Sequence, residues 1–120
     1  MVLVDTSVWI DHFRSALPAL ADALGRQDVL THSIVIGELA SGNLKRRSQT
    51  LSDLRSLPRA KEATFDECLH LIETHALHSQ GLGWNDLQLL ASARLSSTQL
   101  WSSDKRLHQA ASDLHLAYKP

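Results

Sequence analysis

Two aspartates directly follow short apolar segments that are typical of buried β-strands. Asp5 comes after Val2-Leu3-Val4, and Asp104 comes after the segment Gln99-Leu-Trp-Ser102. In open α/β sheets, ligands bind outside the carboxyl ends of the strands. Both carboxylates are therefore expected at the edge of the sheet where binding sites form.

Two further acids lie on segments with a helical pattern. Glu38 stands within Ile34-Val-Ile-Gly-Glu-Leu-Ala40, which is apolar nearly all round, so we expect its carboxylate to be buried. Burying a carboxylate is costly unless it is paired or bound to a metal. Asp86 lies in the first turn of Trp84-Asn-Asp-Leu-Gln-Leu-Leu-Ala91, which is also largely apolar.

Taken together, the four acids favour a shared site for a divalent cation. Carboxylates that lie close together raise one another's pKa unless a cation sits among them. Mg²⁺ and Mn²⁺ prefer oxygen ligands of this kind. Taken singly, the three aspartates also suit helix caps or first-turn charges, and Glu38 also suits a buried ion pair with an arginine. The sequence alone leaves both explanations open.

The elements that must position these acids alternate between short apolar runs and helical patterns. Strands are expected at residues 2–4, 28–31 and 99–102, with an edge strand at residues 115–118, and helices between them. Ser33 is expected to cap the helix that carries Glu38. This alternation predicts an α/β fold around a central parallel sheet. No linker or repeat interrupts residues 1–120, so we expect a single domain.

The composition is that of an ordinary soluble domain. The 120 residues carry 12 Lys+Arg and 13 Asp+Glu, a net charge of -1. No apolar run approaches the ~18 residues of a membrane span, and Met1-Val-Leu-Val-Asp5 has no secretory signal, so a cytoplasmic location is expected. The single cysteine, Cys68, excludes a disulfide framework and is expected in the core.

The histidines and tryptophans are expected to have structural positions and no catalytic role. The seven histidines lack the spacing of zinc ligands, so solvated positions are expected for them. Trp9, Trp84 and Trp101 could stack on nucleic-acid bases, but they stand beside apolar runs and are expected in the core. Trp9 is the expected exception to a core position, because it lies on the first helix close to the site.

Basic residues gather in places that suit contact with phosphates. Lys45, Arg46 and Arg47 open a stretch that runs to Lys61, and Lys105 and Arg106 directly follow the last acid. A local basic face of this kind favours a nucleic-acid ligand. The alternative for the 45–61 stretch is an ordinary solvated helical face.

Four motifs, in this order, resemble PIN-domain ribonucleases. They are Val2-Leu-Val-Asp5-Thr-Ser-Val-Trp-Ile10, Gly37-Glu38-Leu39, Asp86-Leu-Gln-Leu-Leu-Ala91 and Leu100-Trp-Ser-Ser-Asp104-Lys-Arg-Leu107. Within that family, the short chain and the order of elements are similar to the VapC toxins of bacterial toxin–antitoxin pairs. The resemblance runs from residue 2 to about residue 118.

The resemblance implies a three-layer α/β/α fold with a small central parallel sheet of four or five strands. It also implies a Mg²⁺- or Mn²⁺-dependent endoribonuclease, in which a metal-activated water hydrolyses RNA phosphodiester bonds. Thr6 and Ser102 are implied to hold the acids or the metal-bound waters. The implied catalytic residues and metal ligands are Asp5, Glu38, Asp86 and Asp104.

The implied partners are RNA, with transfer RNA as a candidate, a VapB-type antitoxin and a second copy in a homodimer. Trp9, Ile10 and Phe13, with the helix at residues 48–57, are expected to offer the antitoxin an apolar groove. Two alternatives remain open: an RNA-processing PIN nuclease without an antitoxin, and a non-catalytic RNA-binding module. The intact set of four acids argues against the module.

Overall fold

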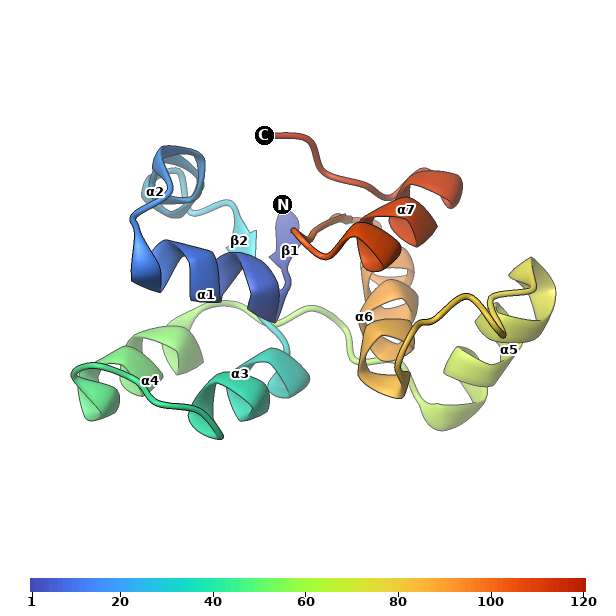
Figure 1. Cartoon of the computed structure of the whole chain (residues 1–120), viewed down its shortest axis with the longest axis horizontal. Helices are drawn as coiled ribbons and strands as arrows, with labels where there is room; N and C mark the ends of the chain where they lie inside the picture. Colours follow the sequence, from blue (N-terminus) through green and yellow to red (C-terminus); the bar gives the residue numbers. More distant parts are fainter.

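The structure, a computed structural model, describes all residues 1–120 and is shown in Figure 1. Three strands and seven helices follow one another along the chain. They are β1 (Val2–Val4), α1 (Thr6–Arg14), α2 (Pro18–Gly25), β2 (Val29–Leu30), α3 (Ser33–Ala40), α4 (Arg47–Ser56), α5 (Phe65–His75), α6 (Trp84–Leu95), β3 (Gln99–Trp101) and α7 (Lys105–Asp113).

The predicted α/β fold is confirmed, with fewer strands than the resemblance implied. The strands are all parallel in the order β2-β1-β3, and Leu3 of β1 is paired with Leu30 on one side and Leu100 on the other. Arg59 and Ala117 extend the two edges as isolated parallel bridges. Each edge segment makes only two backbone hydrogen bonds to its neighbour, so neither becomes a strand. The expected edge strand at residues 115–118 is thus a single bridge.

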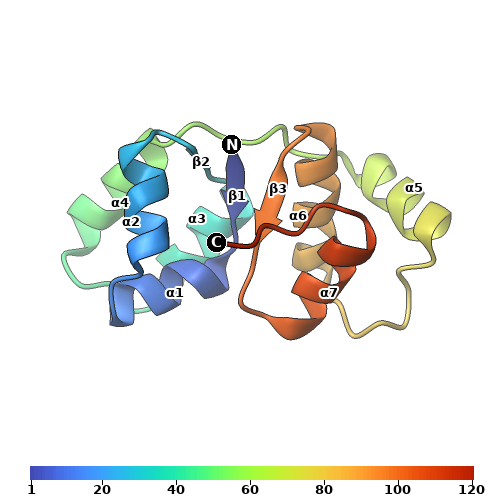
Figure 2. The same cartoon turned by 90° about the horizontal axis from the view of Figure 1, so that it is seen from above.

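Helices surround this small sheet. Figure 2 shows α1 to α4 on the side of β2 and α5 to α7 on the side of β3. Successive residues of a strand point to opposite faces of a sheet, and all three residues of β1 are buried, so both faces are covered. Because both faces are covered, the strand segments are continuously apolar in the sequence and do not alternate with polar residues. Cys68 is buried in the core, as predicted.

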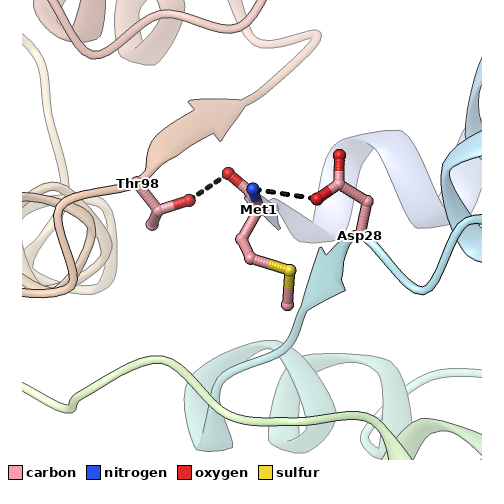
Figure 3. A network of polar contacts seen from close by, with 3 residues as sticks. All are labelled: Met1, Asp28 and Thr98. Carbon is pink, nitrogen blue, oxygen red and sulfur yellow. Dashed lines mark hydrogen bonds and ion pairs between the residues drawn. The ribbon is translucent and has the colours of Figure 1, made fainter.

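Polar contacts of Met1 connect the amino ends of the three strands. The amine of Met1 forms an ion pair with Asp28 Oδ1 at 2.9 Å, and the Met1 carbonyl accepts a hydrogen bond from the Thr98 hydroxyl (Figure 3). Asp28 directly precedes β2 and Thr98 directly precedes β3. The hydrogen bond from the amine is the main cause that lowers the pKa of Asp28.

The opposite end of the sheet holds a topological switch point. From β1 the chain passes through α1 and α2 to β2, and then through α3 to α6 to β3 on the other side of β1. The chain that leaves β1 goes to one side of that strand, and the chain that enters β3 arrives on the other side. The connections therefore diverge at the carboxyl ends of β1 and β3. Ligands bind at this place in open α/β sheets.

Four predictions are wrong: the core position of Trp84, the position of Trp9 outside the core, the solvated position of His32 and the capping of α3 by Ser33. Trp84 is 41% exposed, because it is the first residue of α6 and precedes the apolar face of that helix. Trp9, in contrast, is 4% exposed. His32 is buried, and it caps α3 in place of Ser33 by accepting the Ile34 N–H at its Nδ1. The sequence pattern could not show that a ring nitrogen would take this role.

A second hydrogen bond holds the other side of the His32 ring. Nε2 lies 3.0 Å from the Ser92 hydroxyl of α6, which also accepts the Ala63 N–H. Because Nδ1 accepts a hydrogen bond, the proton of the neutral ring is on Nε2. Burial lowers the pKa of His32, so the fold favours this neutral form.

Candidate metal and active site

The fold brings the four predicted acids to the carboxyl end of the sheet. Asp5 follows β1, Asp104 precedes α7 just beyond β3, and Asp86 lies in the first turn of α6. In Figure 2, the first turns of α6 and α7 lie at the end to which β1 and β3 point. Burial is the main cause that raises the pKa of Asp86, and repulsion from the other three carboxylates raises it further. Asp86 therefore lies within electrostatic reach of all of them.

Asp5 is held by two hydroxyl groups. Its side chain is 5% exposed, and its Oδ2 accepts hydrogen bonds from Ser7 Oγ at 2.6 Å and from Ser102 Oγ at 2.8 Å. Asp5 stands at the cap position of α1, yet its carboxylate makes no capping hydrogen bond. The helix-cap explanation therefore does not account for this residue.

The helix-cap explanation does hold for the other two aspartates. Asp104 Oδ1 accepts the Leu107 N–H at 3.0 Å, which caps α7. Asp86 Oδ2 accepts the Gly83 N–H at 3.0 Å, just before α6. In each case the cap occupies one oxygen only. Capping and ligand binding are therefore compatible, because they use different oxygens of the same carboxylate.

The expected burial of Glu38 is wrong. Val35 and Leu39 form the buried side of α3, while Gly37 and Glu38 lie on its exposed side. Glu38 has no arginine partner, and its Oε1 accepts a hydrogen bond from the Thr6 hydroxyl at 2.8 Å. A short helix with apolar residues all round could not reveal which side the neighbouring α1 leaves open.

All four acids share one arrangement: one oxygen is anchored and the other has no hydrogen-bond partner in the protein. The free oxygens are Asp5 Oδ1, Glu38 Oε2, Asp86 Oδ1 and Asp104 Oδ2. No three acidic, histidine or cysteine side chains are gathered closely enough to enclose an ion. The four free oxygens therefore do not form a closed coordination shell. This fits Mg²⁺, which keeps several waters and is held by few carboxylates together with substrate phosphate.

Residues 102–104 join this site to α1. Ser102 Oγ accepts the Asp104 N–H at 3.0 Å, and Ser7 Oγ accepts the Ser103 N–H at 3.0 Å. Ser103 in turn donates to Asp11 Oδ2 at 2.8 Å. The sequence prediction placed Thr6 and Ser102 beside the acids, gave Ser7 only a place in the motif that follows Asp5, and did not include Asp11. The spacing of Ser7, two residues after Asp5, was the available signal.

Comparisons with known proteins identify the family of this chain. The PIN domain family matches residues 2–113. Ribonuclease VapC32 of Mycobacterium tuberculosis (strains CDC 1551 / Oshkosh and ATCC 25618 / H37Rv) is 42% identical over 118 residues, which cover 98% of this chain and 95% of the relative. The chain is a PIN domain of the VapC family.

The fold of this PIN domain is also found in a solved structure. A chain of VapBC-1 from nontypeable Haemophilus influenzae superposes with a TM-score of 0.72, covering 99% of this chain and 97% of that chain. The two sequences are 19% identical, so this likeness concerns the fold. No helix of the PIN domain is long and apolar enough to cross a membrane.

The predicted basic residues differ in what they contact. Arg47 donates to the carbonyl oxygens of Ala40 at 2.6 Å and Gly42 at 3.2 Å, so it closes the carboxyl end of α3. The other four are exposed and make no ion pair; they are Lys45, Arg46, Lys105 and Arg106. Arg47 thus has a structural contact that the sequence did not indicate.

A groove of about 540 Å³ lies between α1, the end of α3 and the loop at residues 42–45 of the PIN domain, and Glu38 of the acidic site is one of its lining residues. Ile10 and Phe13 of α1 line it as well, and Thr50 is its one residue from α4. A smaller pocket of about 220 Å³ lies between α1 and α4 and is lined by Trp9 and Phe13. The expected groove of Trp9, Ile10, Phe13 and the helix at residues 48–57 is thus divided between these two hollows. The Trp9 Nε1–H is buried and has no acceptor in the protein, which is costly.

Proposed function

We propose that this PIN domain is a Mg²⁺- or Mn²⁺-dependent endoribonuclease and the toxin of a toxin–antitoxin pair. The observation that carries the proposal is the set of four carboxylates, each anchored by one oxygen and free at the other. The relatives that share its family are named ribonucleases, which supports the same reaction. A homodimer is part of the proposal and is checked by sedimentation.

A divalent ion at this site would neutralise charge on the scissile phosphate and lower the pKa of a bound water. The residues of the chain would hold the reacting groups in place. Asp5, fixed by Ser7 and Ser102, offers the most rigid ligand oxygen. Asp104 and Glu38 flank it, and Asp86 would orient the attacking water. Positioning of this kind lowers the entropic part of the barrier.

The substrate that we propose is an unpaired region of RNA, with transfer RNA as the first candidate. Four carboxylates repel a polyanion, so nearby cations must offset that repulsion. Lys105 and Arg106 directly follow Asp104, are exposed and are not engaged in ion pairs. Single-stranded loops expose base edges and faces that an RNA duplex hides, so a cleaved loop is expected.

The test is incubation of the purified protein with total RNA in Mg²⁺, in Mn²⁺ and with a chelator, with the cut ends mapped. We expect discrete cleavage that requires metal and leaves 3′-hydroxyl and 5′-phosphate ends. D5N should lose this cleavage, since it weakens the ligand with little change in volume. D113N is the matched control, because Asp113 lies at the far end of α7 and contacts only Gln109. Cleavage that survives chelation or D5N contradicts the proposal.

We further propose that a VapB-type antitoxin occupies the groove of Ile10, Phe13 and Glu38 together with the adjoining pocket between α1 and α4. An apolar segment of the antitoxin would cover Ile10 and Phe13. An arginine of that segment would pair with Glu38 in the groove and so block the acidic site. The solved VapBC-1 complex supports a partner of this kind.

Expression in a bacterium tests this partner. The wild-type protein should arrest growth, D5N should not, and the neighbouring small gene should restore growth and yield a complex that co-purifies. F13A should weaken that complex, because it removes the largest exposed apolar side chain of the groove. Equal recovery of the complex with F13A and with the wild type contradicts the groove assignment.

A further inference from the structure

Two aromatic side chains are exposed side by side at the start of α5 and α6. Phe65 is 64% exposed and Trp84 is 41% exposed, which makes Phe65 the most exposed large apolar residue of the chain. Their ring centroids are 5.5 Å apart and the ring planes are tilted by 52°. The two rings therefore contact each other and still offer aromatic surface to solvent. Exposed apolar surface of this kind marks binding sites.

This aromatic pair lies at the same end of α6 as the acidic site. Trp84 is the first residue of α6, and Asp86 is in the same turn. Residues two apart in a helix are separated by about 3 Å along its axis and by about 200° around it, so Trp84 and Asp86 point to different sides of α6. The hydrogen bond from the Gly83 N–H to Asp86 fixes this turn. A strand bound at the acids therefore meets the aromatic pair after it passes over the start of α6.

A cation lies next to the loop that leads to Trp84. Arg106 packs over Gly81 so closely that a Cβ at Gly81 would stand 2.6 Å from Arg106 Nη1, and Gly81 also has a φ of +76°. The guanidinium has no carboxylate partner. Aromatic surface beside an unpaired cation is complementary to a base and its phosphate. An apolar helix of a partner protein would use the aromatic surface but would have no use for the cation, so nucleic acid fits this surface better.

We propose that Phe65 and Trp84 form a stacking platform for an unpaired base of the RNA strand that is bound at the acids, across the start of α6 from them, with Arg106 contacting a phosphate between the two places. This inference rests on the proposed ribonuclease function and adds a subsite to it. Stacking on aromatic rings is tolerant of base identity, because every base has a π-face. The platform thus orders the strand beside the cleavage site.

The experiment measures binding of two fluorescein-labelled strands of about twelve nucleotides, a site size within the usual range for single strands. One is oligoadenylate and the other is the same ribose–phosphate strand without bases. D5N protein with a chelator prevents cleavage. W84A and F65A, each placed in D5N, should bind oligoadenylate about 5- to 150-fold more weakly, and the abasic strand equally well. W84F should retain most of the affinity, and R106Q should weaken binding of both strands.

L95A is the matched control, because Leu95 is a similarly exposed apolar residue at the other end of α6. It should bind both strands as the parent does. The platform is overturned if W84A loses affinity equally for both strands, or if D5N shows no preference for the base-bearing strand. It is also overturned if W84A or F65A dissociates an oligomer without a change in RNA binding. Absence of RNA cleavage by the wild type instead overturns the proposed function, so the two failures are distinguishable.

Discussion

Removal of the Ser102 hydroxyl tests how the site is held together. Ser102 Oγ donates to Asp5 Oδ2 at 2.8 Å and accepts the Asp104 N–H at 3.0 Å, so one buried atom joins two of the four acids. S102A deletes both hydrogen bonds. Ser7 still donates to Asp5, but the Asp104 N–H loses its acceptor.

The expected magnitude follows from these two contacts. A hydrogen bond to a charged group contributes about 1.5–3 kcal/mol, and a hydrogen bond between neutral groups contributes about 0.5–1.5 kcal/mol. Ser7 retains part of the first contribution, so we expect a loss of about 2 kcal/mol in the free energy of unfolding. Loss of a group that orients a ligand typically lowers metal affinity about 10- to 100-fold, and we expect a decrease in that range for Mn²⁺.

Urea unfolding and calorimetric titration with Mn²⁺ measure the two effects. S102T keeps the hydroxyl and should restore both values toward those of the wild type. S103A is the control next along the chain, because the Ser103 hydroxyl is exposed and contacts Asp11 instead of an acid of the site. If S102A matches S103A in both unfolding free energy and Mn²⁺ affinity, Ser102 does not position Asp5.

Two further predictions concern Glu38 and His32. E38Q should lower Mn²⁺ affinity in calorimetry while changing the free energy of unfolding by less than about 0.5 kcal/mol, because Glu38 is exposed; an unchanged titration would exclude it as a ligand. The pKa of His32 is lowered from 6.5, chiefly by burial and also by Arg59, against the raising effect of Glu62. The unfolded chain thus binds the proton more tightly, so the stability from neutral His32 is complete above pH 6.5 and lost as the pH falls through the folded pKa. Urea unfolding from pH 8 to 5 should show a steeper loss for the wild type than for H32Q; parallel curves would refute this.

The sequence predicted those parts of the fold in which the local residue pattern follows directly from the position of a strand in the sheet. Val2-Leu3-Val4 is apolar without alternation because β1 is the central strand, and Asp5 follows it at the switch point. Parallel strands bring their carboxyl ends to one edge, so the neighbourhood of Asp5 and Asp104 could be predicted from order alone. The edge segments at Arg59 and Ala117 could not, since a single bridge leaves no periodic pattern.

Predictions about exposure failed where they depended on which side a neighbouring helix covers. Glu38 was expected to be buried because α3 is apolar, but it lies on the exposed side of α3, where it accepts a hydrogen bond from the Thr6 hydroxyl. Trp84 was expected in the core, yet it begins its helix and packs on Phe65 at the surface. Such side chains are set by tertiary packing, and helical periodicity in a helix of eight residues constrains them weakly.

The anomalous scattering of Mn²⁺ in crystals of the wild-type protein locates the metal relative to the four acids. We expect a peak at the carboxyl end of β1, about 2.1 Å from Asp5 Oδ1, as is usual for small divalent ions with oxygen ligands, and bordered by the free oxygens of the other acids. The anchored oxygens, Asp5 Oδ2 among them, should keep their hydrogen bonds to Ser7 and Ser102. No peak at saturating Mn²⁺, or a peak away from all four free oxygens, would exclude a metal site built on these acids.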